Sequence, residues 1–394
     1  MTTAKIDPAG HIILPPEALG RFGLNPGTEL SVVADKDGVA LYPLQPDAHR
    51  AFIEVTAFCN LNCAVCIRQA WRDHPGDMSW ETFEKVIHDL RAFPRLERLT
   101  FGGLGEPLSH LRIADMLMLA SSLNVGLVLT TNALLLDEAM CRVLLDARVD
   151  TVVVSLDSFH VQAYDLAQID HGVDQVLTNV RRLRRMSQEL GWLVPRIGLE
   201  FVATRDNQTQ AARLPEIASD LGASFIIISN LLPYRPEQTG QTLYDRAEPV
   251  AIPASWAVGG GSWLLWGITK LPRMKWGAER RCRFVEENSL VIGWDGGVSP
   301  CYALAHTYPY YVYGRHKEVE RYVLGNVQER SLAEIWSSEE YVHFRARVRQ
   351  FRFPSCVDCP LEGGCDYAAE NQDCWGNNPS CADCLWAQSI VQCP

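Results

Sequence analysis

Three cysteines in the first part of the chain have a spacing that suits a metal centre. Cys59, Cys63 and Cys66 are separated by gaps of three and two residues and directly follow a predicted strand. A cubane [4Fe–4S] cluster normally takes four thiolates, so three close ones can hold three irons and leave the fourth iron for an outside ligand. The alternatives are a zinc site, which needs a fourth ligand close by, or buried thiols. The spacing therefore predicts a cluster with one iron open to a chelating molecule.

A glycine-rich turn is predicted at the end of the next strand. It comprises Gly102, Gly103, Gly105, Glu106 and Pro107. Glycine lets the backbone approach a ligand closely, and the Glu106 carboxylate could accept a hydrogen bond from an ammonium group. A plain glycine turn capped by an acid is the alternative. Further along, short polar residues that could bond a ribose or a carboxylate end two more predicted strands, namely Thr131 and Asn132, then Ser155 and Asp157.

The elements that must position these groups form an α/β pattern. Between residues 51 and 230, short β-branched runs alternate with amphipathic segments such as Ser79–Phe93 and Val173–Leu190. Six βα units of this kind predict a partial, TIM-like (β/α)6 barrel, whose functional groups belong at the carboxyl ends of the strands. The expected strands are Phe52–Phe58, Arg98–Gly102, Gly126–Thr131, Thr151–Leu156, Ile197–Ala203 and Ser224–Ser229.

Composition excludes several classes of protein. The 394 residues are 47% hydrophobic and 21% charged, as in soluble globular proteins of two or three domains. Lys and Arg total 36 against 47 Asp and Glu, a net charge of −11 that makes nucleic acid an unlikely partner on electrostatic grounds. Apolar runs are too short to cross a membrane, and the first ten residues do not resemble a secretory signal. We expect a cytoplasmic protein, where 13 cysteines favour metal sites over disulfides.

The cysteine triad resembles the C-x3-C-x2-C signature of the radical SAM enzymes. This resemblance implies that the open iron binds S-adenosylmethionine and that one electron, from a donor such as ferredoxin or flavodoxin, cleaves it to a 5′-deoxyadenosyl radical. The turn at Glu106 is similar to the family's site for the methionine amino group. Val65 resembles the apolar position whose backbone meets the adenine, and Thr131, Asn132, Ser155 and Asp157 match family positions more loosely.

The cysteines from Cys282 onward resemble those of the SPASM domain, a C-terminal extension that binds auxiliary [4Fe–4S] clusters. The match follows the spacing from Cys282 to Cys365, but Ala369 stands where the family has its next cysteine. Nine cysteines in residues 282–394 could supply two auxiliary clusters with one thiol left over, while zinc would also fit some of the pairs. We expect Cys282, Cys301 and Cys374 in one cluster and Cys356, Cys359 and Cys365 in the other, with Cys381, Cys384 and Cys393 competing for the remaining places.

Residues 1–46 are expected to be a separate unit. Their short β-rich stretches, separated by glycine and proline residues, resemble the sequence of the AbrB/SpoVT swapped-hairpin domain. They carry three Lys or Arg against five Asp or Glu, which favours pairing of two chains or docking of a partner over DNA binding. Residues 50–233 would be the barrel. Residues 234–281, rich in tryptophan, glycine and proline, are interpreted as a linker or cavity cover.

Nearly the whole chain resembles the radical SAM maturases associated with tungsten-dependent oxidoreductases of the aldehyde ferredoxin oxidoreductase type. This resemblance implies a role in completing such an enzyme or its cofactor. A peptide- or protein-modifying radical SAM/SPASM enzyme is the alternative, and a DNA-binding redox sensor a second one. The segments that carry the resemblance, besides the domains above, are Asn230–Tyr234, Tyr308–Tyr311, Asp373–Gly376 and Pro379–Trp386.

Overall fold

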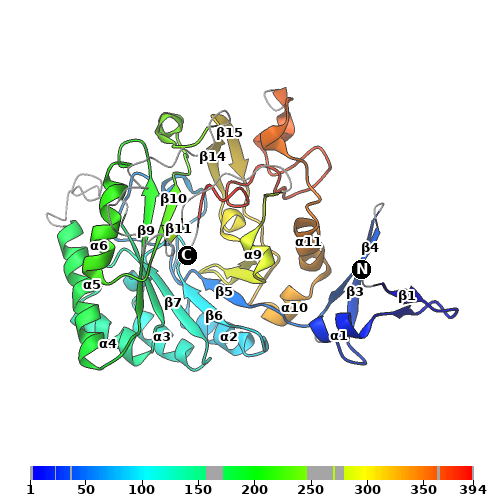
Figure 1. The fold of residues 1–394 in the computed structure, drawn as a ribbon, viewed down its shortest axis with the longest axis horizontal. Helices are drawn as coiled ribbons and strands as arrows, with labels where there is room; N and C mark the ends of the chain where they lie inside the picture. Colours follow the sequence, from blue (N-terminus) through cyan, green and yellow to red (C-terminus); the bar gives the residue numbers. More distant parts are fainter. Residues whose placement is uncertain are drawn as a thin grey trace.

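The computed structural model describes residues 3–22, 24–35, 38–156, 172–245, 269–270, 279–361 and 364–392. Its central element is a ten-stranded sheet (Figure 1). Six neighbouring strands of this sheet are parallel and lie in chain order, as a run of βα units requires. These strands are β5 (Arg50–Ile53), β6 (Arg98–Phe101), β7 (Gly126–Thr131), β8 (Thr151–Ser155), β9 (Arg196–Ala203) and β10 (Phe225–Asn230).

The helices between these strands have sequence signals at their ends. Ser79 accepts from the Thr82 N–H at 3.1 Å and Asp137 from the Met140 N–H at 2.8 Å, so each caps a helix start. Gly222 ends the last helix in the left-handed conformation, with φ of 63°. The apolar stripes of these helices pack on the sheet and enclose the main core. The helices are α2 (Trp80–Leu90), α3 (Ile113–Ser121), α4 (Glu138–Asp146), α5 (Gly172–Glu189) and α6 (Leu214–Leu221).

The C-terminal part of the chain extends the same sheet, which the sequence pattern did not predict. Strand β12 (Ser289–Ile292) pairs parallel with β5, and β13 (Gly297–Ser299) and β16 (Gly325–Asn326) follow antiparallel. At the opposite edge β11 (Thr269–Lys270) pairs with β10. Within the described residues the sheet runs from β11 to β16 without closing on itself, so a complete barrel is not formed.

Outside the sheet, the C-terminal part consists of a hairpin and short helices. The hairpin strands are β14 (Tyr308–Val312) and β15 (Arg315–Val319), and the α-helices are α9 (Arg283–Glu286), α10 (Leu332–Trp336) and α11 (Glu339–Arg349). A second apolar cluster packs around them. The 3-10 helices among the described residues are η1 (Ile67–Ala70), η2 (Pro107–Ser109), η4 (Gln210–Arg213), η5 (Pro236–Gln241), η7 (Tyr302–Leu304), η8 (Cys356–Asp358) and η10 (Asp366–Ala369).

The N-terminal segment lies at one side of the molecule (Figure 1). It contains α1 (Pro16–Phe22) and two separate hairpins, β1 (Lys5–Ile6) with β2 (Ile12–Ile13) and β3 (Leu30–Asp35) with β4 (Gly38–Pro43). Its strands leave Ile6 75% and Val39 64% exposed. The segment therefore contains hairpins and a helix, whereas the swapped-hairpin arrangement stays a prediction.

Most expected elements of the barrel are confirmed within a few residues. The first strand is the exception, because β5 begins and ends earlier than predicted. Of residues 234–281, the structure describes η5 and β11, and the tryptophans and glycines interpreted as a linker or cover lie outside the described residues. None of the described helices is long and apolar enough to span a membrane.

Candidate active site

A cavity of about 250 Å³ lies at the carboxyl ends of the parallel strands. It collects residues from the cysteine loop, from the glycine turn and from four strands or strand ends in succession, as expected for this sheet type. Of the residues predicted from sequence, those that line it are Cys59, Cys63, Val65, Cys66, Gly103, Gly105, Glu106, Thr131, Asn132 and Ser155. Gly102 and Pro107 lie just outside the lining, and Asp157 falls outside the described residues.

The cysteine loop is held by hydrogen bonds to its carbonyl groups. Arg68 donates to the Leu61 carbonyl at 2.7 Å, and Gln69 donates to that of Asn62 at 3.1 Å. From the far side, Tyr234 and Gln238 both donate to the Ala64 carbonyl, at 2.7 and 2.8 Å. The loop is therefore fixed by side chains and needs no regular secondary structure of its own.

All three thiols of the loop are half-buried and face the same cavity. Burial raises the pKa of the Cys59 thiol, and this rise is partly offset by the Leu61 N–H, which donates to Sγ at 3.4 Å. The Asn132 side-chain amide also lies 3.9 Å from that sulfur. N–H groups directed at a sulfur are the donors that stabilise cluster thiolates. Three thiols around a ligand-sized cavity therefore fit a cluster with one iron left open.

The glycine turn follows β6 and lies under the cysteine loop. Gly103 has φ of 106°, in the left-handed region. A Cβ at Gly105 would lie only 2.0 Å from the Thr56 carbonyl oxygen, so no larger residue fits there. Gly102 lies beside the Tyr302 hydroxyl, which a Cβ would approach to 3.2 Å. These glycines let the turn bring Glu106 to the wall of the cavity.

Glu106 is a buried carboxylate with three hydrogen bonds from protein groups. Oε1 accepts from the Leu108 N–H at 3.0 Å and from the Thr131 hydroxyl at 2.7 Å, and Oε2 accepts from the Asn132 N–H at 2.7 Å. Burial raises the pKa of Glu106, although these hydrogen bonds oppose the rise. Because an ionised carboxylate has about four acceptor positions, Oε2 keeps one for a ligand.

Thr131 and Asn132 serve the protein itself more than was expected from sequence. The Thr131 hydroxyl donates to Glu106 and accepts from the Ala133 N–H at 2.9 Å. The Asn132 side chain donates to Asn60 at 2.8 Å and accepts from the Leu134 N–H at 3.0 Å. Both residues therefore hold Glu106 and the cysteine loop in place, while Ser155 lines the cavity from the end of β8.

Several cavity residues were missed because they come from the C-terminal part. Tyr302, Tyr308, Trp386 and Gln392 also line the cavity. The C-terminal tail is tied to β10, since the Gln392 N–H donates to the Ser229 hydroxyl at 3.0 Å. No local sequence pattern predicts that these C-terminal residues reach the cavity. Only the density of aromatic residues near the cysteines could have suggested them.

Four of the C-terminal cysteines form one group, in which Cys301 is buried and Cys282, Cys381 and Cys384 are half-buried. Burial raises the pKa of Cys282 to about 12, and that of Cys301, Cys381 and Cys384 is raised by burial too. Neighbouring thiols within the group raise the pKa of Cys282, Cys301 and Cys381 further, which places the four side chains near one another. Cys374, which was expected beside Cys282 and Cys301, is instead exposed. Electrostatic contacts within this group favour Cys381 and Cys384 over Cys374 as neighbours of Cys282 and Cys301, and the ligand set stays a prediction.

The second group is carried by short 3-10 turns. Cys356 begins η8, Cys359 follows its end and Cys365 precedes η10. Burial raises the pKa of Cys356 to about 12, and Asp373, which adjoins Cys374, is among the charges that add to the rise. Cys393 lies outside the described residues, and Cys141 is buried in the main core, as predicted.

A buried ion pair adjoins the C-terminal cysteines. Asp383 is 1% exposed and accepts from Lys317 at 2.8 Å and from Arg315 at 2.6 Å. Although burial opposes it, these two cations hold the pKa of Asp383 below its ordinary value. The negative charge of Asp383 helps to raise the pKa of the Cys356 and Cys384 thiols.

Comparisons with known proteins agree with this geometry. Residues 53–194 match the model of the radical SAM superfamily, and residues 282–360 match that of an iron-sulfur cluster-binding domain, SPASM. A tungsten-containing aldehyde ferredoxin oxidoreductase cofactor-modifying protein of Pyrococcus furiosus is 39% identical over 348 residues, covering 87% of this chain and 96% of that protein.

Solved structures show the same fold at low identity. The protein anSMEcpe with bound AdoMet superposes with a TM-score of 0.55 and 18% identity, covering 86% of this chain and 92% of its own. Streptococcus suis SuiB bound to the precursor peptide SuiA superposes with a TM-score of 0.56 and 16% identity. The superposition covers 82% of this chain and 72% of SuiB.

Proposed function

Because this chain is a radical SAM enzyme and belongs to the family of the tungsten-containing aldehyde ferredoxin oxidoreductase cofactor-modifying protein, we propose that it matures such an oxidoreductase or its tungsten cofactor. It would do so by reductive cleavage of S-adenosylmethionine. The observation that carries the chemistry is the single cavity shared by the three thiols of residues 59–66 and by Glu106.

Cys59, Cys63 and Cys66 would hold the cluster that binds S-adenosylmethionine. When bound, that cluster would supply the electron for reductive cleavage of S-adenosylmethionine and, with it, radical chemistry on the substrate. The chain's own contribution is to bind and orient. Glu106 Oε2 would accept from the methionine amino group, since it keeps an acceptor position directed at the cavity.

The remaining walls would position the nucleoside and exclude water. Val65 and Ile67 give the cavity an apolar side next to the last cysteine. Trp386 and Val391 close it from the C-terminal tail. Such a lining keeps a reactive radical away from solvent and from side reactions.

We also propose two auxiliary [4Fe–4S] sites. Cys282, Cys301, Cys381 and Cys384 would supply the first, because their thiols act electrostatically on one another. Cys356, Cys359 and Cys365 would contribute to the second, with Cys374 as its fourth ligand on the evidence that Asp373 lies near Cys356. Thiolates at both sites would fit the cubane's need for four sulfur ligands.

The proposed substrate class can be tested with a tungsten oxidoreductase isolated from cells that lack this enzyme. Anaerobically reconstituted enzyme, S-adenosylmethionine and a reductant are incubated with that oxidoreductase. We expect 5′-deoxyadenosine formation to rise and aldehyde oxidation to appear. If neither changes, while a cysteine-containing precursor peptide stimulates 5′-deoxyadenosine formation, a peptide-modifying enzyme is the better assignment.

A further inference from the structure

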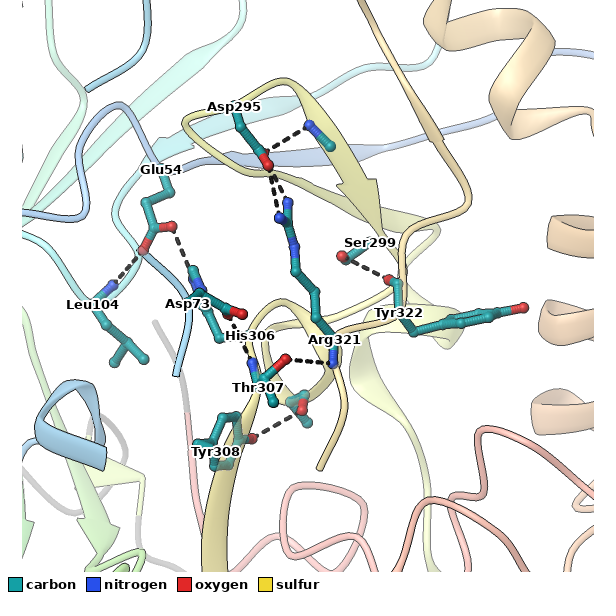
Figure 2. A network of polar contacts seen from close by, with 12 residues as sticks. Glu54, Asp73, Leu104, Asp295, Ser299, His306, Thr307, Tyr308, Arg321 and Tyr322 are labelled. Carbon is teal, nitrogen blue, oxygen red and sulfur yellow. Dashed lines mark hydrogen bonds and ion pairs between the residues drawn. The ribbon is translucent and has the colours of Figure 1, made fainter. Parts of the chain in front are cut away.

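A buried histidine from the C-terminal part lies between two carboxylates of the barrel part (Figure 2). His306 Nε2 is 2.9 Å from Glu54 Oε2, and Nδ1 is 3.2 Å from Asp73 Oδ2. The residue is 6% exposed, and its ring stacks on Trp71 with centroids 3.6 Å apart. A neutral imidazole has one N–H, so both hydrogen bonds can be donated only by the protonated ring.

The first of these carboxylates supports the glycine turn. Glu54 directly follows β5 and is 2% exposed. Its Oε1 accepts from the Leu104 N–H at 3.1 Å, and a Cβ on Gly103 would lie 2.6 Å from the same oxygen. Glu54 therefore fixes the turn that ends at Glu106.

The second carboxylate joins the cysteine loop to the same histidine. Asp73 Oδ2 accepts from His306 and also from the Thr307 N–H at 2.8 Å, while the Arg72 N–H donates to the Thr307 carbonyl at 3.0 Å. Trp71, at the end of η1, completes the contact through its stacked ring. The cysteine loop and the glycine turn thus meet at one residue of the C-terminal part.

A third ion pair holds the residue that follows this histidine, Thr307. Arg321 pairs with Asp295 through two hydrogen bonds of 2.7 Å, and its N–H donates to the Thr307 hydroxyl at 3.1 Å. Figure 2 shows Arg321 reaching from the His306–Thr307 segment to Asp295. The segment therefore has little freedom to follow a movement of Glu54 or Asp73.

The charges around the ring favour its protonated form. The titratable groups facing it are Glu54 and Asp73, with Arg321 and its partner Asp295 beyond them. Although burial opposes it, hydrogen bonds with Asp73 and Glu54 raise the pKa of His306 to about 9. Deprotonation would leave two buried carboxylates competing for one donor.

We propose that His306 is a positioning residue for S-adenosylmethionine: it fixes Glu54, and through Glu54 the turn that presents Glu106, from the C-terminal part of the chain. The proposal rests on the S-adenosylmethionine site proposed above and is independent of the final substrate. It means that His306, which does not line the cavity, contributes to the affinity for S-adenosylmethionine without touching it.

The sign of the expected pH dependence follows from the protonated form. A histidine whose pKa is raised contributes fully at neutral pH, and the contribution is lost as pH rises through the raised pKa of about 9. The affinity for S-adenosylmethionine should therefore fall above that pH. Removing one of the two carboxylates should move this fall to lower pH, because less negative charge then stabilises the ring.

The test measures the dissociation constant for S-adenosylmethionine by calorimetry on the reconstituted full-length enzyme, at intervals from about pH 7 to about pH 10. His306→Gln should bind roughly tenfold more weakly at neutral pH and lose the fall at alkaline pH, since it can no longer donate to both carboxylates. Asp73→Asn should shift the fall to lower pH. His316→Gln is the matched control, a half-exposed histidine of the same part that pairs with Glu318 at 3.4 Å, and it should behave as the wild type.

Wild-type affinity in His306→Gln at every pH would overturn the proposal, as would an alkaline fall that persists unchanged in that variant. If His306→Gln does not retain its iron, Asp73→Asn decides, and an unshifted profile overturns the proposal. A wild-type enzyme that binds no S-adenosylmethionine at any pH would instead overturn the proposed function on which this inference rests.

Discussion

The two best-defined groups of cysteines differ in what surrounds them. The three thiols of residues 59–66 are half-buried and share a cavity with a carboxylate and several hydrogen-bond donors. In the other group, Cys301 is buried in the second apolar cluster and Cys282 and Cys381 pack against it; neither these three nor Cys384 lines that cavity. Three ligands beside a cavity leave room for a molecule on the metal, whereas four cysteine ligands complete a cluster. The same residue type therefore builds an open site in one place and a closed one in another.

The largest expected effect is loss of cleavage when the open site is removed. Changing Cys59, Cys63 and Cys66 together to Ala should abolish 5′-deoxyadenosine formation, because no other group of cysteines leaves an iron free in this account. Iron content should fall by about four per chain from about twelve, with the auxiliary signals retained. Cleavage that survives in this variant would remove the proposed mechanism.

A second prediction separates the closed groups from each other. Cys381→Ala and Cys282→Ala should alter one and the same auxiliary signal in the electron paramagnetic resonance spectrum, whereas Cys374→Ala and Cys356→Ala should alter the other. The reason is that Cys381 lies with Cys282 and Cys301, while Cys374 is exposed on a different turn.

The matched control for this series is Cys141→Ala. Cys141 lies in the main core, and the charges that act on its thiol come from Arg182, Asp137 and Glu138 and from no other cysteine, so it should hold no iron. Its iron content should equal that of the wild type. If Cys374→Ala affected the same signal as Cys282→Ala, the grouping first expected from sequence would be restored.

A third prediction concerns the carboxylate that distinguishes the open site. Glu106→Gln should weaken binding of S-adenosylmethionine by about 1.5–3 kcal/mol, through loss of a charge-assisted hydrogen bond to the amino group. Calorimetry on the reconstituted enzyme measures this directly. Glu138→Gln, a change in an exposed carboxylate paired with Arg142, is the control. An unchanged dissociation constant for Glu106→Gln would refute the role of Glu106.

The smallest effect on chemistry is expected from the N-terminal segment, which lies away from both kinds of site. Exposed side chains such as Ile13 and Val39 favour its pairing with a second copy of the chain. Sedimentation should show a dimer for the full chain and a monomer for a chain that begins at Asp47, with cleavage of S-adenosylmethionine retained. If the full chain and the shortened chain are both monomers, or both dimers of equal stability, the segment does not mediate dimerisation and must have another function. A salt-sensitive shift of duplex DNA would favour the regulator alternative.

The sequence was sufficient for the parts of the site that local patterns encode. The cysteine triad, the glycine turn and the polar ends of β7 and β8 were predicted, because each follows a strand that hydrophobic periodicity reveals. Contacts between distant segments have no such signal. Glu54 lies inside the predicted first strand and His306 lies shortly after Cys301, more than half the chain away, so their pairing emerges only when β12 joins β5.

The cysteine grouping shows the same limit. Spacing correctly drew attention to Cys282, Cys301 and the later cysteines, but it could not tell which of those lie beside Cys282 and Cys301. That choice depends on how the tail folds back toward α9 and β10, where Arg281 N–H bonds the Ala387 carbonyl at 3.1 Å and Asn230 N–H bonds that of Ile390 at 3.1 Å. Tertiary packing decides it.

The central claim, that the triad leaves one iron open, is tested most directly by the spectrum of the reduced enzyme with and without S-adenosylmethionine. In the wild type and in Cys381→Ala, adding S-adenosylmethionine should change the electron paramagnetic resonance signal of one cluster. In the triple Ala variant at Cys59, Cys63 and Cys66 the remaining signals should not respond. A response that persists in the triple variant, or none in the wild type, would contradict the account.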